Sequence, residues 1–514
     1  MDYLMAIDLG STSIKAIVFD LDGNRIASAS RPTEKVTPPE HPDWIIWDPN
    51  QIWGGAAAAC KEAIGNVDDP SLIRGVAVTG MGMDGVPVDT QGNALYPFIS
   101  WHDTRTAPQA EWWCNNIGAE RTFMITGFPS WAIVAVMRML WMKEHQPEIM
   151  ARAHKWLLIE DFVNAKLSGV MSTDFSMASC MLLLDQAQRQ WSDELVEASG
   201  IARSLLPDIQ VSGTPLGPIT PEASAATGIP EGTPIIQGGH DHICATLPVG
   251  LFRPGAVLDI IGTWECVQMA LTEPVLTPEI LQADICMQAH VLPGSFIAWG
   301  GAPSGESLEW FRREMGKDVE LNAKDKDAIW DALLAGLKKT ELGASSVMYL
   351  PHISAAGCPI ADTKSLGAFV GINTQTTRDD LLRAVIEGLN FQFLHILEAM
   401  QARLNTSFES ITVTGGVSQN EFWIQNKADM LGLPVEVSDI KDASPLGAAM
   451  LVGLGLNLYP NVQDAYERVK AKGKVYTPRA GATEAYRQNF EIYKRLYPAL
   501  KPVHHALFDR FRQP

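Results

Sequence analysis

Three short segments of the chain combine glycines with acidic or hydroxyl side chains beside apolar stretches. The first is Asp8-Leu9-Gly10-Ser11-Thr12-Ser13-Ile14-Lys15. A hairpin bend of this composition offers backbone N–H groups and hydroxyls to phosphate oxygens. Lys15 would add a positive charge, and Asp8 could hold a hydrated Mg²⁺. Taken alone, the segment also fits an ordinary polar hairpin turn.

The second segment is Gly238-Gly239-His240-Asp241-His242, at the end of an apolar stretch. An acid that follows glycines at the mouth of a cleft suits a general base. One alternative is a loop Asp that caps the next helix. Another is a metal site made by His240 and His242, which is less expected because no nearby carboxylate–His spacing completes a familiar site.

The third segment is Thr414-Gly415-Gly416-Val417-Ser418-Gln419-Asn420, between a predicted strand and a predicted helix. Glycines at this place let a flat ligand approach the backbone closely. The N-terminus of the following helix favours a polar or anionic ligand. The alternative is a tight strand-to-helix turn without a ligand.

Two further segments have sequence patterns that are typical of ligand-binding sites. Gly80-Met81-Gly82-Met83-Asp84-Gly85 matches a dinucleotide fingerprint, but that fingerprint requires a helix directly after it. Because Val86-Pro87-Val88-Asp89 leads into a turn, we predict a strand there and reject the dinucleotide site. Trp101-His102-Asp103-Thr104-Arg105 places an aromatic ring beside polar groups, which suits a sugar. The alternative is a core Trp with a surface Asp–Arg pair.

The elements that position these segments alternate between strand and helix. The apolar stretches 4–9 and 14–19 predict an antiparallel hairpin, and 257–261 with 264–270 predict a second one around Gly262-Thr263. The chain therefore suggests two related α/β halves with a hinge near residues 240–255. Thr377 and Asp380 resemble a capping box. Further expected elements are helices 51–65, 377–404, 420–431 and 444–454, strands 75–79, 411–414 and 434–437, a mostly helical region 108–200 and Pro-rich loops 207–234.

Composition narrows the classes of function. The chain has 514 residues, a formal net charge of −19, 46% hydrophobic and 19% charged residues. Such an acidic chain does not favour nucleic acid. The longest apolar run, 131–142, is interrupted by Arg138 and is too short to span a membrane. The seven cysteines form no CxxC pair, which argues against a disulfide framework and a zinc site. With no signal-peptide pattern, we expect a cytoplasmic protein.

Together these segments resemble the FGGY family of carbohydrate kinases. Residues 8–15 resemble the first phosphate motif, and Gly262-Thr263 the second. The adenosine motif is resembled by Gly415, Gly416, Val417, Asn420, Gln425, Ala428 and Asp429. The strongest match is to the C-terminal signature, over residues 367–372 and 380–387. The N-terminal signature is met in part, with Arg138 where Lys is usual, in a segment expected to be a packed helix.

The resemblance implies an actin-like, ribonuclease H-like ATPase fold, with two domains around a central cleft. We place these domains at residues 1–245 and 246–514. It also implies ATP and Mg²⁺ as cofactors, Asp241 as the catalytic base, and Asp8 as the Mg²⁺ site, through water. The phosphate and adenosine contacts would come from Gly10, Ser11, Thr12, Ser13, Lys15, Gly262, Thr263, Gly305, Gly415, Gly416, Val417 and Asn420. The sugar would face Met83, Asp84, Trp101, Asp103 and Asp241.

The substrate is expected to be a small ketose or polyol. Typical D-xylulose kinases carry Met-His-Gly where this chain has Met83-Asp84-Gly85, and glycerol kinases carry an Arg-Glu pair there. The loop and Gly262-Thr263-Trp264 look more like members that act on L-xylulose or erythritol, so we favour a pentulose or a tetritol-like substrate. Family members are often dimers. The alternatives are an actin-like ATPase that binds protein partners and a catalytically silent sugar sensor.

Overall fold

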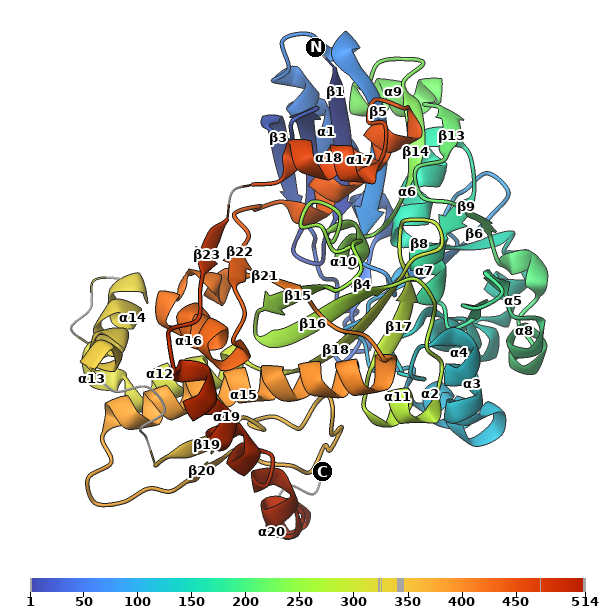
Figure 1. The fold of residues 1–514 in the computed structure, drawn as a ribbon. Coiled ribbons are helices and arrows are strands. Elements are labelled where there is room, and N and C mark those ends of the chain that lie inside the picture. Colours follow the sequence, from blue (N-terminus) through green and yellow to red (C-terminus); the bar gives the residue numbers. More distant parts are fainter. Residues whose placement is uncertain (1, 322–323, 325, 340–345, 472, 512–514) are drawn as a thin grey trace.

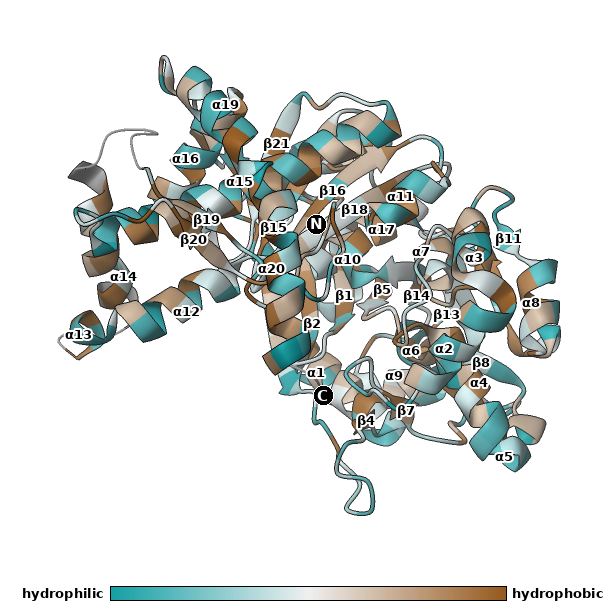
Figure 2. Ribbon diagram, turned by 90° about the horizontal axis from the view of Figure 1, so that it is seen from below, coloured by the Kyte–Doolittle hydropathy of each residue, from teal (hydrophilic) through white to brown (hydrophobic). Residues whose placement is uncertain are grey.

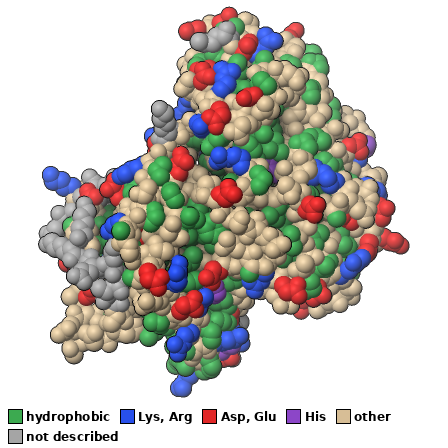
Figure 3. All heavy atoms as spheres, in the orientation of Figure 1, with side chains coloured by type: hydrophobic (Ala, Val, Ile, Leu, Met, Phe, Trp, Pro, Cys, Tyr) green, Lys and Arg blue, Asp and Glu red, His purple; other side chains and the backbone are tan. Residues whose placement is uncertain are grey.

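The structure is a computed structural model that describes residues 2–321, 324, 326–339, 346–471 and 473–511. Each half of the chain builds one large mixed sheet with helices packed against it (Figure 1). Within the described residues, no helix has the length and apolar character needed to cross a bilayer. On the face in Figure 3, the described Lys and Arg side chains lie among Asp and Glu side chains and form no basic patch.

The N-terminal sheet begins with the predicted apolar hairpin. β1 (Tyr3–Leu9) is wholly buried and pairs antiparallel with β2 (Ser13–Asp20). On its other side β1 runs parallel to β5 (Ile73–Gly80), which runs parallel to β14 (Pro234–His240). The antiparallel edge strands β3 (Arg25–Pro32) and β13 (Pro215–Pro218) complete the order β13-β14-β5-β1-β2-β3.

The C-terminal sheet repeats this pairing. β15 (Ala256–Ile261) and β16 (Trp264–Leu271) form an antiparallel hairpin that continues into β18 (Phe296–Pro303). β15 also runs parallel to β21 (Ser410–Thr414), and β21 to β22 (Val435–Val437). The edge strands are β17 (Cys286–Ala289) and β23 (Lys474–Tyr476), in the order β17-β18-β16-β15-β21-β22-β23. The topology therefore confirms two related halves, each with a hairpin of this kind.

Helices bury both faces of β1, because its apolar side chains alternate between two core clusters. Met5 and Ile7 belong to a cluster with α1 (Pro49–Gly65), and Leu4 and Ala6 to a cluster with α17 (Ala443–Gly455). α17 is late in the chain but packs against β1 and β5, so it ties the two halves together (Figure 1). α10 (Asp241–Cys244) lies beside α17. The group beside the C-terminal sheet comprises α12 (Gly305–Met315), α15 (Arg378–Leu404), α16 (Glu421–Leu431) and α19 (Ala482–Tyr493).

The region 108–200 is mainly helical, as predicted, with short strand pairs between the helices. Its helices are α2 (Ala107–Trp113), a π-helical turn (Cys114–Gly118), α3 (Ala119–Thr126), α4 (Ala135–His145), α5 (Pro147–Arg152), α6 (Ile159–Ser168), α7 (Phe175–Ser179) and α8 (Asp193–Ser199). The short pairs of this half are β4 (Ile46–Trp47) with β7 (Phe98–Ile99), β6 (Gly85–Val88) with β8 (Lys155–Leu158), β9 (Ser172–Asp174) with β12 (Asp208–Gln210), and β10 (Leu184–Asp185) with β11 (Gln190–Trp191).

The remaining elements lie mostly at the periphery, where the helices alternate teal and brown along their length in Figure 2, as expected of helices that bury one face. They are α9 (Pro221–Thr227), α11 (Pro278–Gln282), α13 (Lys317–Glu320), α14 (Lys326–Ala335), α18 (Val462–Val469), α20 (Leu496–Phe511), the pair β19 (Met348–Leu350) and β20 (Ala368–Val370), and 3₁₀ turns at Pro70–Leu72, Arg203–Leu205, Gly336–Lys339 and Gly416–Gln419.

Two local predictions are confirmed and one is wrong. Thr377 and Asp380 form a reciprocal capping box at the start of α15. A strand, β6, follows Gly80–Asp84 where the dinucleotide fingerprint would need a helix. The Pro-rich loop 207–234 instead contains β12, β13 and α9, because an edge strand and the first turn of a helix both tolerate proline.

Candidate active site

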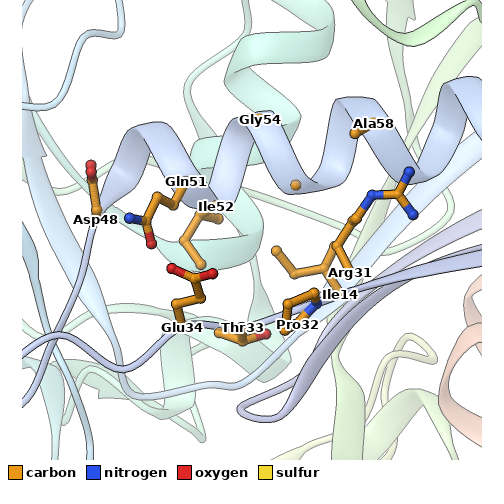
Figure 4. Close-up of a pocket in the computed structure, with 11 residues that line it drawn as sticks. Ile14, Arg31, Pro32, Thr33, Glu34, Asp48, Gln51, Ile52, Gly54 and Ala58 are labelled. Atoms are coloured by element: carbon orange, nitrogen blue, oxygen red, sulfur yellow. The ribbon is translucent and has the colours of Figure 1, made fainter.

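The first phosphate turn is held by its own backbone and by the end of β3. The Gly10 N–H donates to the Ser13 carbonyl at 3.1 Å. Thr33 donates its N–H to the Thr12 carbonyl at 3.0 Å and its hydroxyl to the Gly10 carbonyl at 2.6 Å. Thr33 also borders a cavity of about 330 Å³ between α1 and β3, with Glu34 and Gln51 at one end and Arg31 at the other (Figure 4). The turn is therefore braced from behind, with the Thr12 side chain exposed.

Asp8 lies near the end of β1 with 9% of its surface exposed. Burial raises the pKa of Asp8 to about 7, the negative charge of Asp241 adds to this, and Lys15 opposes it. The structure thus brings Asp8 and Asp241 into one electrostatic site although they are far apart in the sequence. Lys15 is also engaged across the halves, because its Nζ donates to Asp442 Oδ1 at 3.2 Å.

Asp241 begins α10 directly after β14. Its Oδ1 accepts the His242 N–H at 2.5 Å and lies 3.3 Å from His240 Nε2. Burial raises the pKa of Asp241, while His242 opposes that shift. His240 Nδ1 lies 2.8 Å from Gln288 Nε2, and burial lowers the pKa of both histidines to about 4. Both rings are therefore neutral near pH 7 and surround a carboxylate whose proton affinity is raised.

Gly82 explains the glycine pattern before β6. A Cβ at Gly82 would lie 2.5 Å from Cys180 Sγ and 2.9 Å from the His240 ring. A side chain would therefore displace His240 from its place beside Asp241. The glycine at this position makes room for His240, which gives the pattern a packing function within this fold.

The second phosphate turn, the start of α12 and the adenosine loop surround one cavity of about 690 Å³. The Gly305 N–H donates to the Gly262 carbonyl at 3.0 Å, and the Ser304 N–H donates to the Thr263 carbonyl at 3.0 Å. Gly415 has φ +104°, in the left-handed region, and any Cβ there would meet the Ile261 backbone. The cavity is lined by Ile261, Gly262, Thr263, Gly305, Glu306, Glu309, Trp310, Arg313, Ile353 and Gly416. Three segments far apart in the sequence thus converge around one cavity.

Two residues of the adenosine motif have particular positions. Asn420 caps α16, because its side-chain oxygen accepts the Trp423 N–H at 3.1 Å. The Val417 side chain lies outside the described part of the structure.

The sequence did not predict that Trp310 and Arg313 of α12 line this cavity. A helix with one apolar and one charged face carries no signal that it borders a ligand site.

The predicted sugar residues differ in how they are held. Asp84 is fully buried and accepts the Trp47 Nε1–H at 2.7 Å, and Arg138 Nη2 lies 3.8 Å away. Burial raises the pKa of Asp84 to about 6, against the opposing effects of Arg138 and Trp47. Met83 is half-buried, and Trp101 is 38% exposed with its ring stacked on His102 at 3.8 Å. Arg138 lies within the buried helix α4, as the sequence predicts for that segment.

Asp103 is engaged by the protein itself. Its carboxylate accepts two hydrogen bonds from the Arg105 guanidinium, at 2.8 and 2.5 Å, and one from the Ile45 N–H at 2.7 Å. The Arg105 guanidinium also lies 3.6 Å from the centre of the Trp44 ring. The Asp103–Arg105 pair is almost fully buried, so the alternative of a surface Asp–Arg pair is wrong. Direct contact of Asp103 with a sugar stays a prediction.

Beneath the second turn lies a buried ion cluster that the sequence did not reveal. Lys427 Nζ pairs with Asp259 and, at 2.6 Å, with Glu265 Oε1. Glu265 Oε2 accepts the Ser304 hydroxyl at 2.8 Å, next to Gly305. Burial acts to lower the pKa of Lys427, and the two carboxylates outweigh it and raise that pKa. This cluster ties α16 to both strands of the second hairpin.

Comparisons with known proteins identify the family of this chain. The N-terminal domain of the FGGY family of carbohydrate kinases matches residues 3–248, and its C-terminal domain matches residues 258–456. The chain is 30% identical to an L-fuculokinase of Escherichia coli (strain K12), over 93% of this chain and 98% of the relative. It is 27% identical to a xylulose kinase of Bacillus subtilis (strain 168), over 99% of both chains.

Solved structures give the same result. The xylulose kinase of Rhodospirillum rubrum superposes with a TM-score of 0.89 at 26% identity, over 98% of this chain and 100% of that one. A xylulose kinase of Brucella ovis superposes with a TM-score of 0.85 at 25% identity, over 98% and 100%. The two-domain actin-like fold and sugar kinase activity follow, with ATP as the family's phosphate donor. The chain belongs to the FGGY family of carbohydrate kinases.

Proposed function

We propose that this kinase transfers the γ-phosphoryl group of ATP to a hydroxyl of a small ketose or polyol, with Asp241 as general base. Asp241 accepts the hydroxyl proton, the sugar oxygen bonds to the γ-phosphorus, and the bond from that phosphorus to ADP breaks. The observation that supports this role is the site that the partly buried Asp241 shares with Asp8, in which burial raises the pKa of both carboxylates. A raised pKa suits a carboxylate that must take up a proton.

The phosphate track in this proposal runs between the two hairpin turns. Gly10, Ser11, Thr12 and Ser13 contact the phosphates from the N-terminal domain (1–245), with Lys15 nearby. Gly262, Thr263 and Gly305 contact them from the C-terminal domain (246–514), and Gly415, Gly416, Val417 and Asn420 hold the adenosine. The cavity lined by Gly262, Thr263, Gly305 and Gly416 supports the second set. Catalysis of this kind rests on in-line positioning and charge neutralisation.

Asp8 is the residue that would hold Mg²⁺, through water. Repulsion from Asp241 contributes to the raised pKa of Asp8, and a bound divalent cation relieves such repulsion. Among the described residues, no three His, Cys, Asp or Glu side chains gather as a metal cage. That fits Mg²⁺, which usually takes one or two carboxylates, phosphate oxygens and waters. When bound, Mg²⁺ neutralises charge on the β- and γ-phosphate oxygens.

The sugar side of the site would use Met83, Asp84, Trp101 and Asp103. We favour a pentulose, or a tetritol-like substrate, because the Met83-Asp84 pair differs from the Met-His of typical D-xylulose kinases. The relatives named L-fuculokinase and xylulose kinase support a ketose.

The seven cysteines are all free, which fits a reducing cytoplasm.

A coupled ADP-release assay tests the proposal with Mg·ATP and L-xylulose, D-xylulose, D-ribulose, L-fuculose, erythritol, erythrulose and glycerol. One strong substrate is expected. Asp241→Asn should lower turnover by about 10²–10⁴-fold. Its melting temperature should be no lower than that of the wild type, because burial raises the pKa of Asp241. Asp68→Asn, at an exposed carboxylate, is the matched control. Sugar-independent ATP hydrolysis across the whole panel would favour an actin-like ATPase, and full activity of Asp241→Asn would refute the assigned base.

A further inference from the structure

One face of the C-terminal sheet is turned toward the catalytic segment. Directly paired residues of antiparallel strands lie on the same face, and so do residues two apart on one strand. Gln268 on β16 pairs with Trp299 on β18, and Cys266 is two residues before Gln268. Cys266 Sγ lies 3.7 Å from His242 Nε2, so this face looks onto the residue that follows Asp241.

Two polar side chains on this face lack hydrogen-bond partners among the described residues. Both amide atoms of Gln268 and the indole Nε1 of Trp299 are buried and make no hydrogen bond with the described part of the chain. The polar neighbour of Gln268 is the Cys266 thiol, which is a weak partner. Buried polar groups are nearly always paired, because leaving one unpaired costs free energy. Two such side chains, directly opposite each other, therefore call for a missing partner.

A third side chain on the same face provides a contrast. Gln288 pairs with Ile297, which lies two residues from Trp299, so Gln288 belongs to this face as well. Its amide nitrogen donates to the Ser176 carbonyl at 3.0 Å and lies 2.8 Å from His240 Nδ1. Gln288 is therefore satisfied by the protein, whereas Gln268 is not, although both are glutamines buried beside the catalytic segment.

Trp299 also joins the two halves. Its ring lies 6.3 Å from that of His242, 5.8 Å from that of Trp131 and 6.2 Å from that of Phe128, measured between ring centres. Trp131 and Phe128 come from the N-terminal half, near the start of α4. The half-buried Met83, predicted to face the sugar, packs against the same apolar cluster as Trp131 and Trp299. An aromatic wall with an unpaired N–H suits the apolar face and the hydroxyls of a sugar.

We propose that Gln268 and Trp299 form the contribution of the C-terminal half to the sugar site. The Gln268 amide and the Trp299 N–H would bind sugar hydroxyls other than the one that Asp241 deprotonates, and the Trp299 ring would cover a C–H face. Gln268 is fully buried, on the face whose Cys266 lies beside His242, so the sugar would reach it when the two halves separate. The inference rests on the proposed function and adds two specificity residues from the half otherwise occupied with ATP.

Three variants test it in the full-length enzyme. Gln268→Met and Trp299→Phe keep the volume of the side chain or its aromatic ring but remove the unpaired polar atoms. Each should lower kcat/KM for the sugar about 10- to 100-fold, with the KM for ATP unchanged. Without sugar, Gln268→Met should melt at the same or a higher temperature, because an unpaired buried group is removed. Gln288→Met, the matched control, should melt at a lower temperature.

Deoxy analogues of the substrate sharpen the test. A sugar that lacks the hydroxyl bound by Gln268 should lose kcat/KM with the wild type but not with Gln268→Met. If Gln268→Met melts lower, as Gln288→Met does, and keeps its sugar kcat/KM, the amide binds only internal water and the inference is overturned. If the wild type shows no sugar-dependent ADP release, the proposed function fails first. Normal wild-type turnover with unchanged variants would overturn this inference alone.

Discussion

The two hairpin turns of this kinase look alike in sequence but use their acidic residues in opposite ways. Asp8 precedes Gly10 by two residues, whereas Asp259 precedes Gly262 by three. Because side chains alternate along a strand, that single step places the two carboxylates on opposite faces. Asp8 interacts with Asp241, which follows β14 of the same sheet, and Asp259 is buried against Lys427 of α16.

The difference separates a turn that we propose to bind ligands from a turn whose acidic residues are paired within the protein. At the first turn, burial and Asp241 hold a carboxylate at a pKa of about 7, with only a partly exposed lysine to oppose them. At the second turn, Lys427 neutralises Asp259 and Glu265 in the interior, and the Ser304 hydroxyl supports Glu265. The Asp8 carboxylate at the first turn is therefore available to a ligand, whereas the Asp259 and Glu265 carboxylates at the second turn are paired with Lys427 and stabilise the fold.

The largest expected effect comes from removing the buried lysine. Lys427→Met leaves two buried carboxylates without a cation, which should lower the free energy of unfolding by about 3–5 kcal/mol. Denaturant unfolding measures this change. Lys474→Met, which breaks an exposed pair with Glu421, should change stability by less than about 1 kcal/mol.

A compensated variant keeps that test decisive. Lys427→Met combined with Asp259→Asn and Glu265→Gln removes the uncompensated charges, so much of the lost stability should return. If the triple variant is no more stable than Lys427→Met alone, the lysine acts through packing, for example over the Phe393 ring, and not through charge.

The second prediction concerns Asp8. Asp8→Asn should reduce turnover about 100-fold, because the proposed Mg²⁺ site loses its carboxylate. The variant should still fold. The variant should also be more stable than the wild type above pH 7. Since burial raises the pKa of Asp8 to about 7 from 3.8, the folded state binds its proton more tightly than the unfolded state does. The wild type therefore loses stability as the pH rises from about 4 to 7.

Unfolding measured at several pH values checks this sign. The stability gained by Asp8→Asn should grow through that range by as much as about 4 kcal/mol and level off above it. A gain that is constant with pH would mean that Asp8 is not held at a raised pKa. Burial and Glu265 also raise the pKa of Asp259, but its carboxylate is paired with Lys427, so the corresponding substitution Asp259→Asn should destabilise the protein by leaving Lys427 one partner fewer.

The sequence predicts the parts of the fold that local patterns encode. The two apolar hairpins, the capping box of α15 and the strand after Gly85 were all readable, because each depends on side-chain periodicity or on neighbouring residues. The resemblance to known kinases extended this to the actin-like fold. Short strands such as β12 and β13 were missed, since prolines obscured their pattern.

What the sequence could not predict depends on contacts between distant segments. Nothing local in Asp103 indicates that Arg105 and the Ile45 N–H engage its carboxylate. Lys15 carries no sign that Asp442, over 400 residues later, is its partner. The face of the sheet on which Asp259 lies can be predicted only once the strand register is known. The pairing of Gln268 with Trp299 likewise follows only from the order of the strands in the sheet. Assembly of the site is therefore a property of the tertiary structure.

The third prediction tests how the first turn is braced. Thr33→Val removes the hydrogen bond from the hydroxyl to the Gly10 carbonyl and keeps the shape of the side chain. Loss of one such bond is worth about 1 kcal/mol, so the KM for ATP should rise about fivefold while the KM for the sugar stays unchanged. Thr33→Ser restores the hydroxyl and should restore the KM. Equal rises in both KM values would mean that Thr33 supports the whole domain and not the turn.

The smallest expected effect concerns the ion pairs that link the first turn to α17. Lys15 and Arg25 both pair with Asp442, and the two cations are partly exposed. Asp442→Asn should therefore change stability by less than about 1 kcal/mol, and less in high salt. Its effect on ATP is more informative. If Lys15 binds phosphate, freeing it from Asp442 should lower the KM for ATP, and Lys15→Met should raise it. If the KM for ATP is the same in both variants as in the wild type, Lys15 belongs with Lys427 as a structural cation, and the first turn then binds phosphate through its backbone and hydroxyls alone.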